Sequence, residues 1–156
     1  MRSISTEAFV GAPEWAAVGR PMEKTSALWD TGATNCVITK GFAAQLGIVP
    51  ITQAPVRHGG GQTIENVYLI DIALPNGTKY PGVRVTECPN TVGDFGIIIG
   101  MDIICTGDLA VTNHNGKTVV SFRVPSKKAI DFNIEMKQDN EALLRFQQKA
   151  SKHRAR

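Results

Sequence analysis

The stretch ALWDTGATNCVIT, residues 27–39, places an acidic residue between two apolar runs. The first run ends at Trp29, Asp30 and a Thr-Gly pair follow directly, and a second run begins at Val37. A carboxylate between two strand-like runs is expected to be at least partly buried. Burying a charge is unfavourable unless the group is paired, hydrogen-bonded or used in chemistry. The stretch therefore predicts a functional acid where a strand enters a turn.

The composition is that of one globular domain with an ordinary core. The chain has 156 residues, 42% hydrophobic and 20% charged, and its net charge at pH 7 is +3. A basic tail on a nearly neutral body argues against a nucleic-acid-binding body. Much of the positive excess lies in that tail, at Lys149, Lys152, Arg154 and Arg156.

The cysteines and the N-terminus indicate a reducing compartment. Cys36, Cys88 and Cys105 are odd in number and lack CxxC spacing, so they do not suggest a disulfide framework. The first 15 residues lack the apolar run of a signal peptide, and no stretch is long enough to span a bilayer. We therefore expect a cytoplasmic protein without a membrane partner.

Most of the chain is predicted to form short strands separated by turn residues. Thr39 is expected to cap a short helix that ends at Gly47. An Asn115-Gly116 pair marks a tight hairpin turn, and residues 101–107 are expected to form one helical turn. Many short strands with little helix predict a small β-barrel or sandwich. Single strands are expected over 14–18, 25–30, 35–39, 78–87 and 95–100, and hairpins over 54–77 and 108–124.

Three further features accompany the Asp-Thr-Gly tripeptide. The tripeptide alone is a weak signal, because a given tripeptide occurs by chance in about two per cent of chains of this length. Ala33 follows it, and the apolar stretch IIIGMDII, residues 97–104, comes later in the chain. Between the Asp-Thr-Gly motif and this apolar stretch lies a hairpin with a Gly-Gly-Gly tip, residues 59–61.

This combination resembles the retropepsin-like aspartic proteases, over residues 15–124. The resemblance is closer to the cellular and bacterial members than to the viral enzymes. It implies an all-β, acid-protease half-barrel with a flap hairpin, one or two short helices and a homodimeric assembly. It also implies the roles of the site residues: Asp30 as the catalytic carboxylate, Thr31, Gly32 and Ala33 as the active-site loop, Gly59, Gly60 and Gly61 as the flap tip, and Ile98, Ile99, Gly100 and Asp102 as the structure behind the site.

The chain departs from the viral pattern at two positions. Viral enzymes usually carry an acidic residue and an arginine that pair with each other, where this chain has Thr34 and Met101. Asp102 is kept, as in the cellular relatives. Its expected role is structural, bonding the helical turn in which it lies.

The number of motifs predicts the assembly. The chain contains no second Asp-Thr-Gly or Asp-Ser-Gly, so one chain supplies one catalytic carboxylate. A two-fold dimer would place the same loop opposite itself. Two close carboxylates hold one proton between them, so one can take a proton from water while the other polarises the peptide carbonyl. Ala33 cannot donate a hydrogen bond to this pair, so we expect a less acidic pH optimum than that of pepsin-like relatives.

The predicted function is an aspartic endopeptidase that cuts extended polypeptides without a cofactor or a metal. The alternative is a catalytically silent dimeric module of the same fold that binds peptides or proteins. A thiol dyad of Cys36 with His58 has no local signature. The three histidines lack metal-ligand spacing with the cysteines.

The sequence divides into three segments. Residues 1–14 form an N-terminal segment, residues 15–125 a protease domain, and residues 126–156 a basic, partly helical tail. A helix is expected over 140–156. A tail of this kind is usually solvated charge, and the alternative is that it tethers the protease to a larger partner or to nucleic acid.

Overall fold

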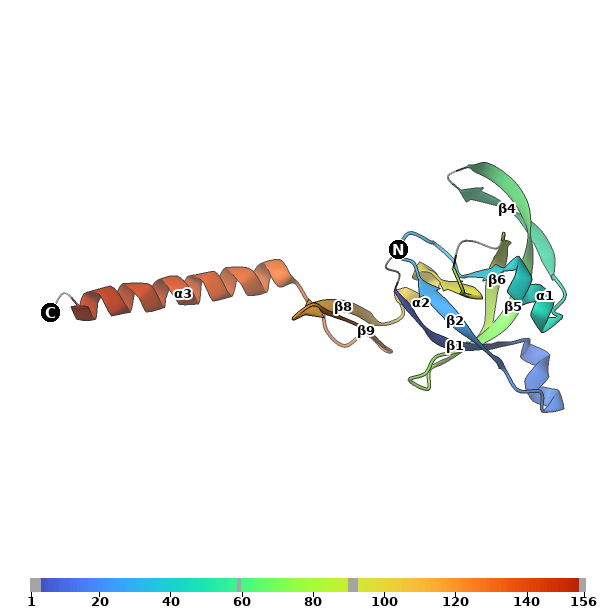
Figure 1. The fold of residues 1–156 in the computed structure, drawn as a ribbon, viewed down its shortest axis with the longest axis horizontal. Coiled ribbons are helices and arrows are strands. Elements are labelled where there is room, and N and C mark those ends of the chain that lie inside the picture. The colour runs from blue at the N-terminus through green and yellow to red at the C-terminus, as the bar shows by residue number, and fades with distance from the viewer. Residues whose placement is uncertain (1–3, 59, 90–92, 155–156) are drawn as a thin grey trace. The chain divides into compact units, whose positions relative to one another are not determined.

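The computed structural model describes residues 4–58, 60–89 and 93–154. The chain divides into two compact units, Met1–Ser126 and Lys127–Arg156. The strands of the described residues all belong to the first unit (Figure 1). The all-β, retropepsin-like fold predicted from the resemblance is therefore confirmed for that unit.

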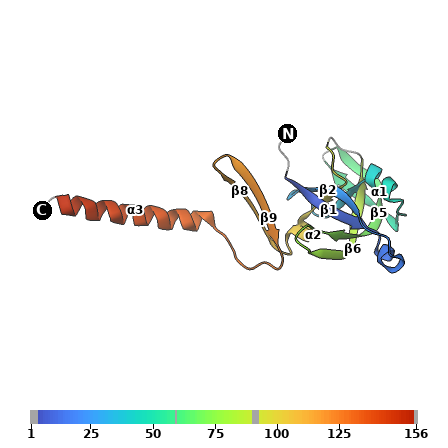
Figure 2. The ribbon, with the colours of Figure 1, turned by 60° about the horizontal axis from the view of Figure 1, so that its bottom comes forward.

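The first unit is built on one sheet that closes on itself. Its strand order is β1-β2-β7-β3-β6-β5-β4, and β1 also pairs with β5. This second pairing turns the sheet into a barrel and leaves β4 at an edge. Figure 2 shows β1 and β2 side by side, as their antiparallel register requires. The strands are β1 (Ser5–Gly11), β2 (Glu23–Trp29), β3 (Val37–Thr39), β4 (Thr52–His58), β5 (Gly61–Ala73), β6 (Lys79–Cys88) and β7 (Ile97–Ile99).

The N-terminal strand is part of this barrel. Residues 5–11, which the sequence places in a separate N-terminal segment, pair with β2 along one side and with β5 along the other. Ala8 and Val10 are fully buried in the core. The strand thus closes the barrel between β2 and β5.

Strand β7 lies between β2 and β3, parallel to β2 and antiparallel to β3. Its apolar sequence predicts a buried strand, and Ile97 and Ile99 are fully buried. Both ends of the segment that joins β2 to β3 are therefore bound to the same central strand.

The chain between β1 and β2 is helical. Residues Pro13–Val18 form a 3-10 helix, η1, where the sequence predicts a strand, so that prediction is wrong. Proline at the first helical position fixes a helical φ, and Gly19, at φ 69°, ends the helix in the left-handed region. Trp15 is buried, with the guanidinium of Arg20 3.5 Å from its ring centre.

Two short α-helices follow the predicted signals. Helix α1 (Lys40–Leu46) begins where the Thr39 hydroxyl accepts a hydrogen bond from the Phe42 amide at 3.3 Å. It ends at Gly47, whose φ is 66°. Helix α2 (Met101–Ile104) is the single turn expected after β7.

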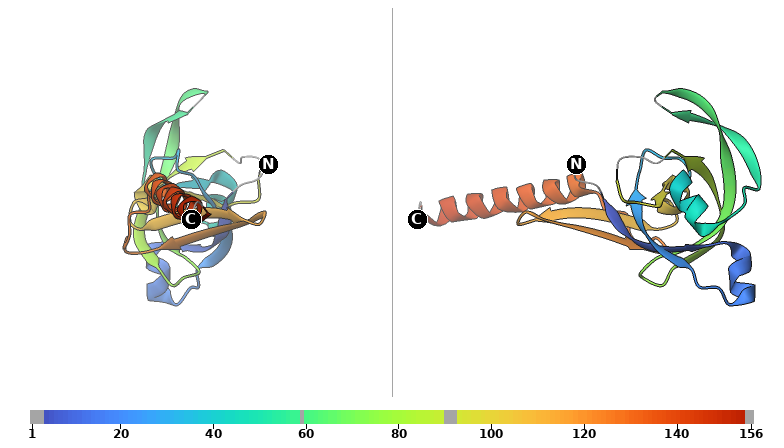
Figure 3. Two further views of the ribbon diagram at one scale, coloured as in Figure 1. Left: turned by 90° about the vertical axis from the view of Figure 1, so that its left-hand side faces the viewer. Right: turned by 45° about the vertical axis from the view of Figure 1, so that its right-hand side comes forward.

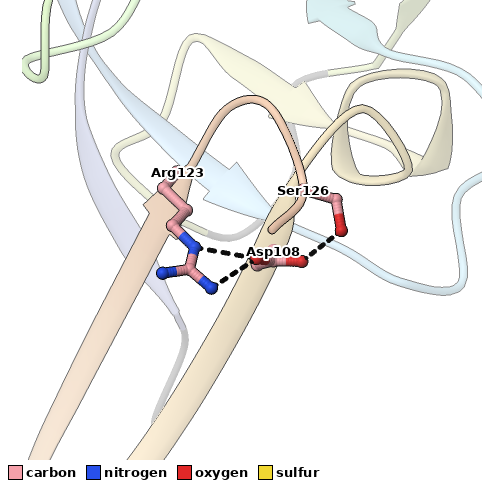
Figure 4. A network of polar contacts seen from close by, with 3 residues as sticks. All are labelled: Asp108, Arg123 and Ser126. Carbon is pink, nitrogen blue, oxygen red and sulfur yellow. Dashed lines mark hydrogen bonds and ion pairs between the residues drawn. The ribbon is translucent and has the colours of Figure 1, made fainter. Parts of the chain in front are cut away.

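Strands β8 (Asp108–His114) and β9 (Lys117–Arg123) form a separate two-stranded sheet. Their turn is the predicted Asn115-Gly116 pair, with φ values of 51° and 75°. Figure 4 shows the open end of the hairpin, where the Asp108 carboxylate bonds two guanidinium nitrogens of Arg123 at 2.7 Å and the Ser126 hydroxyl at 2.5 Å. These bonds fix the two strand ends to each other.

The β4–β5 hairpin is long and curved. It pairs continuously from Thr52 with Val67 to His58 with Gly61. Figures 1 and 3 show it arching away from the rest of the barrel. Val67 is fully buried, whereas Ile64 is 72% exposed. The base of the hairpin therefore belongs to the core and its outer half does not.

The second unit is a single helix, α3 (Phe132–Arg154). It begins earlier than the predicted residue 140, because Asp131 caps it by accepting a hydrogen bond from the Asn133 amide at 2.9 Å. Its large apolar side chains are exposed, among them Phe132 and Phe146. No helix in the described ranges is long and apolar enough to cross a membrane.

Candidate active site

Residues 30–36 join β2 to β3, and we call them the 30–36 loop. The residues on either side of it are paired with β7: Trp29 is in register with Ile99, and Val37 with Ile98. The Asp30 amide continues this pairing, because it donates to the Ile99 carbonyl at 3.0 Å. Asp30 is therefore placed at the end of a buried parallel strand pair.

The Asp30 side chain is half-buried and is oriented by its own loop. Its Oδ1 atom accepts a hydrogen bond from the Gly32 amide at 2.8 Å, and its carbonyl accepts one from the Ala33 amide at 3.2 Å. Within the described ranges, no cation forms an ion pair with this carboxylate. Asp30 is thus an oriented acid without a charge partner in its own described chain.

Gly32 provides room beside that carboxylate. A Cβ atom at Gly32 would lie 3.1 Å from Asp30 Oδ1, tighter than ordinary contacts. The side chain of Thr31 is exposed. In the described part of this single chain it makes no hydrogen bond, so its expected anchoring role stays a prediction.

Gly100 supports the loop from behind. It is buried, and a Cβ atom there would lie 2.6 Å from the carbonyl carbon and oxygen of Asn35 and 2.9 Å from the Ala33 carbonyl oxygen. Only glycine allows the loop to approach this closely. The next residue, Met101, donates its amide hydrogen to the Ala33 carbonyl at 2.8 Å.

Asp102 ties α2 to the same loop. Its amide donates to the Thr34 carbonyl at 3.1 Å, and its carboxylate accepts hydrogen bonds from the Cys36 amide at 2.9 Å and the Cys36 thiol at 3.0 Å. The carboxylate also accepts from the Ile103 amide at 3.0 Å, which is the local bond that the sequence suggests. Asp102 therefore bonds its own turn and the far end of the 30–36 loop.

Cys36 is a structural thiol. It is fully buried, and its sulfur also accepts a hydrogen bond from the Gly100 amide at 3.4 Å. Burial, reinforced by the hydrogen bond to Asp102, strongly raises the pKa of the Cys36 thiol. A nucleophilic cysteine needs a lowered pKa, so this environment argues against a thiol dyad.

A cavity of about 450 Å³ separates the 30–36 loop from the edge strand β4. Apolar side chains from β3, β4 and β5 line it, and two arginines, Arg57 of β4 and Arg84 of β6, complete it. The full lining is Gly32, Ala33, Thr34, Asn35, Val37, Ala54, Pro55, Val56, Arg57, Val67, Arg84 and Thr86. Residues 32–35 of the 30–36 loop line this cavity, whereas Asp30 itself is not part of the lining.

The described glycines of the predicted flap tip do not line this cavity. Gly59 is outside the described residues, Gly60 lies in the turn, and Gly61 begins β5 with φ 126°. Neither Gly60 nor Gly61 lines the cavity, whereas residues 54–57 of the same hairpin do. The flap role of the three glycines stays a prediction.

Comparison with known families agrees with this geometry. A family model described as aspartyl protease matches residues 19–103, which include the 30–36 loop, β7 and part of α2. The chain belongs to the aspartyl protease family. No curated protein matches this aspartyl protease family member.

Solved structures that this aspartyl protease family member matches include cellular and viral retropepsin-like proteins. The retroviral protease-like domain of Ddi1 from Leishmania major is 14% identical, with 83% of this chain and 99% of that chain covered and a TM-score of 0.49. A retropepsin-like aspartic protease from Rickettsia conorii is 15% identical, with 76% of this chain and 80% of that chain covered and a TM-score of 0.46. EIAV protease complexed with the inhibitor HBY-793 is 17% identical, with 67% of this chain and 86% of that chain covered and a TM-score of 0.48.

The structure brings most of the predicted site residues together. Asp30, the rest of its loop and residues 98–102 form one hydrogen-bonded assembly. The sequence does not indicate that Cys36 bonds to Asp102 or that Arg57 and Arg84 line one cavity. The bond between Cys36 and Asp102 joins positions 66 residues apart, so no local pattern indicates it. The arginines occupy ordinary polar positions of strands, and only the closed sheet shows that they share a cavity.

Proposed function

We propose that this aspartyl protease family member is a homodimeric aspartic endopeptidase whose active site combines Asp30 from each of two chains. The orientation of the Asp30 carboxylate and its lack of an ion-pair partner among the described residues carry the proposal. This carboxylate is held by the Gly32 amide at 2.8 Å and has no ion-pair partner among the described residues. Partial burial of a carboxylate is unfavourable unless the group is paired or used in chemistry. The Asp30 carboxylate of a second chain, placed opposite by a two-fold axis, would be such a partner, because the two groups can share one proton.

The chemistry follows from placing two such carboxylates together. Two close carboxylates share one proton, because ionising both is electrostatically unfavourable. The ionised member takes a proton from a water molecule that attacks the peptide carbonyl. The protonated member polarises that carbonyl and then helps to protonate the leaving amine. The backbone bonds around Asp30 and Asp102 would keep each carboxylate in place throughout.

The substrate would be an extended polypeptide. Strand β4 is the edge of the sheet, and it lines the cavity beside the 30–36 loop. Edge strands carry unpaired backbone groups that can add an extended peptide as a further strand. The apolar side chains of Val37, Val56 and Val67 would then contact the side chains of that peptide.

The test is cleavage of a peptide library across pH by the wild type, Asp30→Asn and Asp139→Asn. The last variant makes the same change on helix α3, outside the barrel. We expect the wild type and Asp139→Asn to cut at equal rates and Asp30→Asn not to cut. If Asp30→Asn still cuts, the assignment of the catalytic residue is wrong. If no chain cuts although all are folded and dimeric, the peptide-binding module replaces the endopeptidase.

Mixing the chains tests the shared site. With equal amounts of wild type and Asp30→Asn and random pairing, only about one quarter of the dimers keep both aspartates. Activity per total chain should fall to that level after exchange, and it should also fall steeply on dilution. A fall to one half, without dependence on dilution, would show that each chain works alone.

The pH profile gives a further prediction. Ala33 has no hydroxyl to donate a hydrogen bond to the carboxylate pair, and such a bond would favour ionisation. We expect the optimum of the cleavage rate above about pH 3. An optimum below that value would contradict this role of Ala33. The cytoplasmic location and the segment boundaries at residues 15 and 125 also stay predictions.

A further inference from the structure

We propose that Glu87 is a positioning residue that holds the β4–β5 hairpin in its orientation for binding a polypeptide substrate. The inference rests on the proposed function, because it concerns how that site holds an extended chain. It begins from a buried charge that the catalytic chemistry does not use. Glu87, on β6, is the one buried charged side chain among the described residues, with 7% of its surface exposed.

The Glu87 carboxylate is held by neutral donors. None of the ion pairs in the described ranges includes it. Its Oε2 atom accepts hydrogen bonds from the Tyr68 hydroxyl at 2.5 Å and from the Asn66 side-chain amide at 3.2 Å. Burying a carboxylate costs free energy that an apolar side chain of similar size would not cost. The charge at this position therefore indicates a role other than packing.

The hydrogen bonds continue from β5 to the edge strand β4. The Asn66 side-chain oxygen accepts a hydrogen bond from the Gln53 side-chain amide at 3.2 Å. An ionised carboxylate can only accept, so Glu87 requires the Asn66 nitrogen to face it and leaves the Asn66 oxygen for Gln53. We call these four residues, Gln53, Asn66, Tyr68 and Glu87, the Glu87 network. The network links β6, β5 and β4 in a fixed direction, from the buried acid to the edge of the sheet.

The Glu87 network lies where the hairpin leaves the core. Val67 is fully buried, Asn66 is half-buried, and Ile64 is 72% exposed. Gln53 and Asn66 are partners in the strand register, and the pairs beyond them continue to the turn. Figures 1 and 3 show this outer part arching away from the barrel. A small rotation at the level of Asn66 would therefore become a larger displacement of the outer hairpin.

The cavity lining lies on the other face of the same strands. Val67 and Thr86 are partners in the register, and both line the cavity. Neighbouring residues of a strand point to opposite faces, so Asn66 and Glu87 lie behind them, away from the cavity. Changes in the Glu87 network therefore alter the support of the hairpin without removing a side chain that lines the cavity.

Asn66→Ala is the main test, because it interrupts the network and leaves the bond between Tyr68 and Glu87 in place. We expect the KM for a peptide cleaved from the library to rise about fivefold with kcat within about twofold, because one net hydrogen bond corresponds to about that factor. Gln53→Ala should raise KM less. Adding it to Asn66→Ala should change nothing further, because Gln53 acts through Asn66. Glu87→Gln keeps an acceptor oxygen and should keep KM within about twofold of the wild type.

The matched control is Asn76→Ala. Asn76 also makes two side-chain hydrogen bonds, because it donates to the Phe122 carbonyl at 3.2 Å and accepts from the Thr78 amide at 3.0 Å. It lies outside the β4–β5 hairpin. This variant should lose stability toward urea and keep the KM of the wild type. If it raises KM as much as Asn66→Ala, the effect is one of general stability and the proposal is wrong. If Asn66→Ala fails to fold, Gln53→Ala decides, because Gln53 is exposed.

Hydrogen exchange separates this inference from the proposed function, because it needs no turnover. In Asn66→Ala the backbone amides of residues 54–58 and 61–64 should exchange about tenfold faster than in the wild type, and those of β8 and β9 should not change. If no chain cuts the library but hairpin exchange accelerates in this way, the endopeptidase fails and the support of the hairpin by Glu87 stands. If exchange accelerates but KM stays the same, the positioning role is overturned. If neither changes, the whole inference is overturned.

Discussion

The 30–36 loop and the β4–β5 hairpin line the same cavity, but the chain holds them in different ways. The loop is bound by residues far away in sequence, through Ile99, Met101 and Asp102. The outer half of the hairpin pairs only with itself, and its residues 61–64 are exposed. The acid is therefore fixed by the barrel, whereas the strand that would cover a substrate is attached mainly at its base.

Substitution of Gly100 should have the largest effect on the loop. In Gly100→Ala the new methyl group would lie 2.6 Å from the Asn35 carbonyl, a backbone group that cannot move aside freely. We expect the free energy of unfolding to fall by about 3 kcal/mol and cleavage to be lost. Urea unfolding and peptide cleavage measure the two effects.

Gly77→Ala is the matched control for that loss. Gly77 has φ 86°, and a Cβ atom there would meet no atom within 4 Å. We expect Gly77→Ala to lower the free energy of unfolding by about 1 kcal/mol, because of backbone strain alone. Its rate of peptide cleavage should be unchanged. Equal losses in the two variants would show that close packing behind the loop is unimportant.

Asp102→Asn tests the second support of the loop. An amide has one acceptor oxygen where the carboxylate has two, so some of the donors from Cys36 and Ile103 lose their partner. We expect a loss of about 2 kcal/mol in the free energy of unfolding. The buried Cys36 thiol should also be alkylated faster in the variant, as mass spectrometry can show beside the exposed Cys105. Unchanged labelling of Cys36 would mean that Asp102 does not close the loop.

Tyr68→Phe tests how the hairpin base is attached. The Tyr68 hydroxyl donates to Glu87 at 2.5 Å, and Glu87 also accepts from Asn66, so three residues of β5 and β6 share one buried contact. Losing the hydroxyl should lower the free energy of unfolding by about 1.5 kcal/mol at neutral pH, because Glu87 loses a donor.

The pH dependence of stability gives this variant a second measurement. Burial and the bond to Glu87 raise the pKa of Tyr68 to about 12, whereas a free tyrosine has a pKa of about 10. The folded chain keeps the proton where the unfolded chain has released it. This contribution to stability is therefore complete below about pH 10 and is lost as the pH rises toward 12. Urea unfolding at about pH 9 and about pH 11 should show a shallower decline in Tyr68→Phe than in the wild type. Equal declines would contradict the assignment.

Gly61→Ala should have the smallest effect on stability. Gly61 has φ 126°, yet a Cβ atom there would meet no atom within 4 Å. We expect at most about 1 kcal/mol of lost stability, because the strain lies in the outer hairpin. If this hairpin covers the substrate, KM should rise severalfold while the folded state persists. A stability loss as large as that of Gly100→Ala would remove the distinction between the two regions.

The parts of the fold that the sequence predicts are those with local causes. Thr39 and Gly47 fix the ends of α1 through one cap bond and one left-handed residue. The Asn115-Gly116 pair fixes the β8–β9 turn through two positive φ values. The strand expected over 14–18 fails for a similar local reason, since Pro13 and Gly19 favour a short helix and periodicity cannot separate the two in so short a run.

The candidate site is less local, and the sequence indicates only part of it. Asp30 and its turn are visible because the Asp-Thr-Gly motif is contiguous. The reason for Gly100 is not visible, because the atoms that exclude a side chain belong to Asn35, far away in sequence. The same holds for Arg57 and Arg84, whose shared cavity exists only after β4, β5 and β6 have paired and curved.

The insertion of β7 between β2 and β3 has a consequence for the timing of synthesis. Asp30 leaves the ribosome early, but the strand that aligns its loop and the carboxylate that closes it come only with residues 97–102. A nascent chain that ends before Asp102 carries the aspartate without the geometry around it. The order of translation therefore keeps this acid unassembled until nearly the whole barrel has been made.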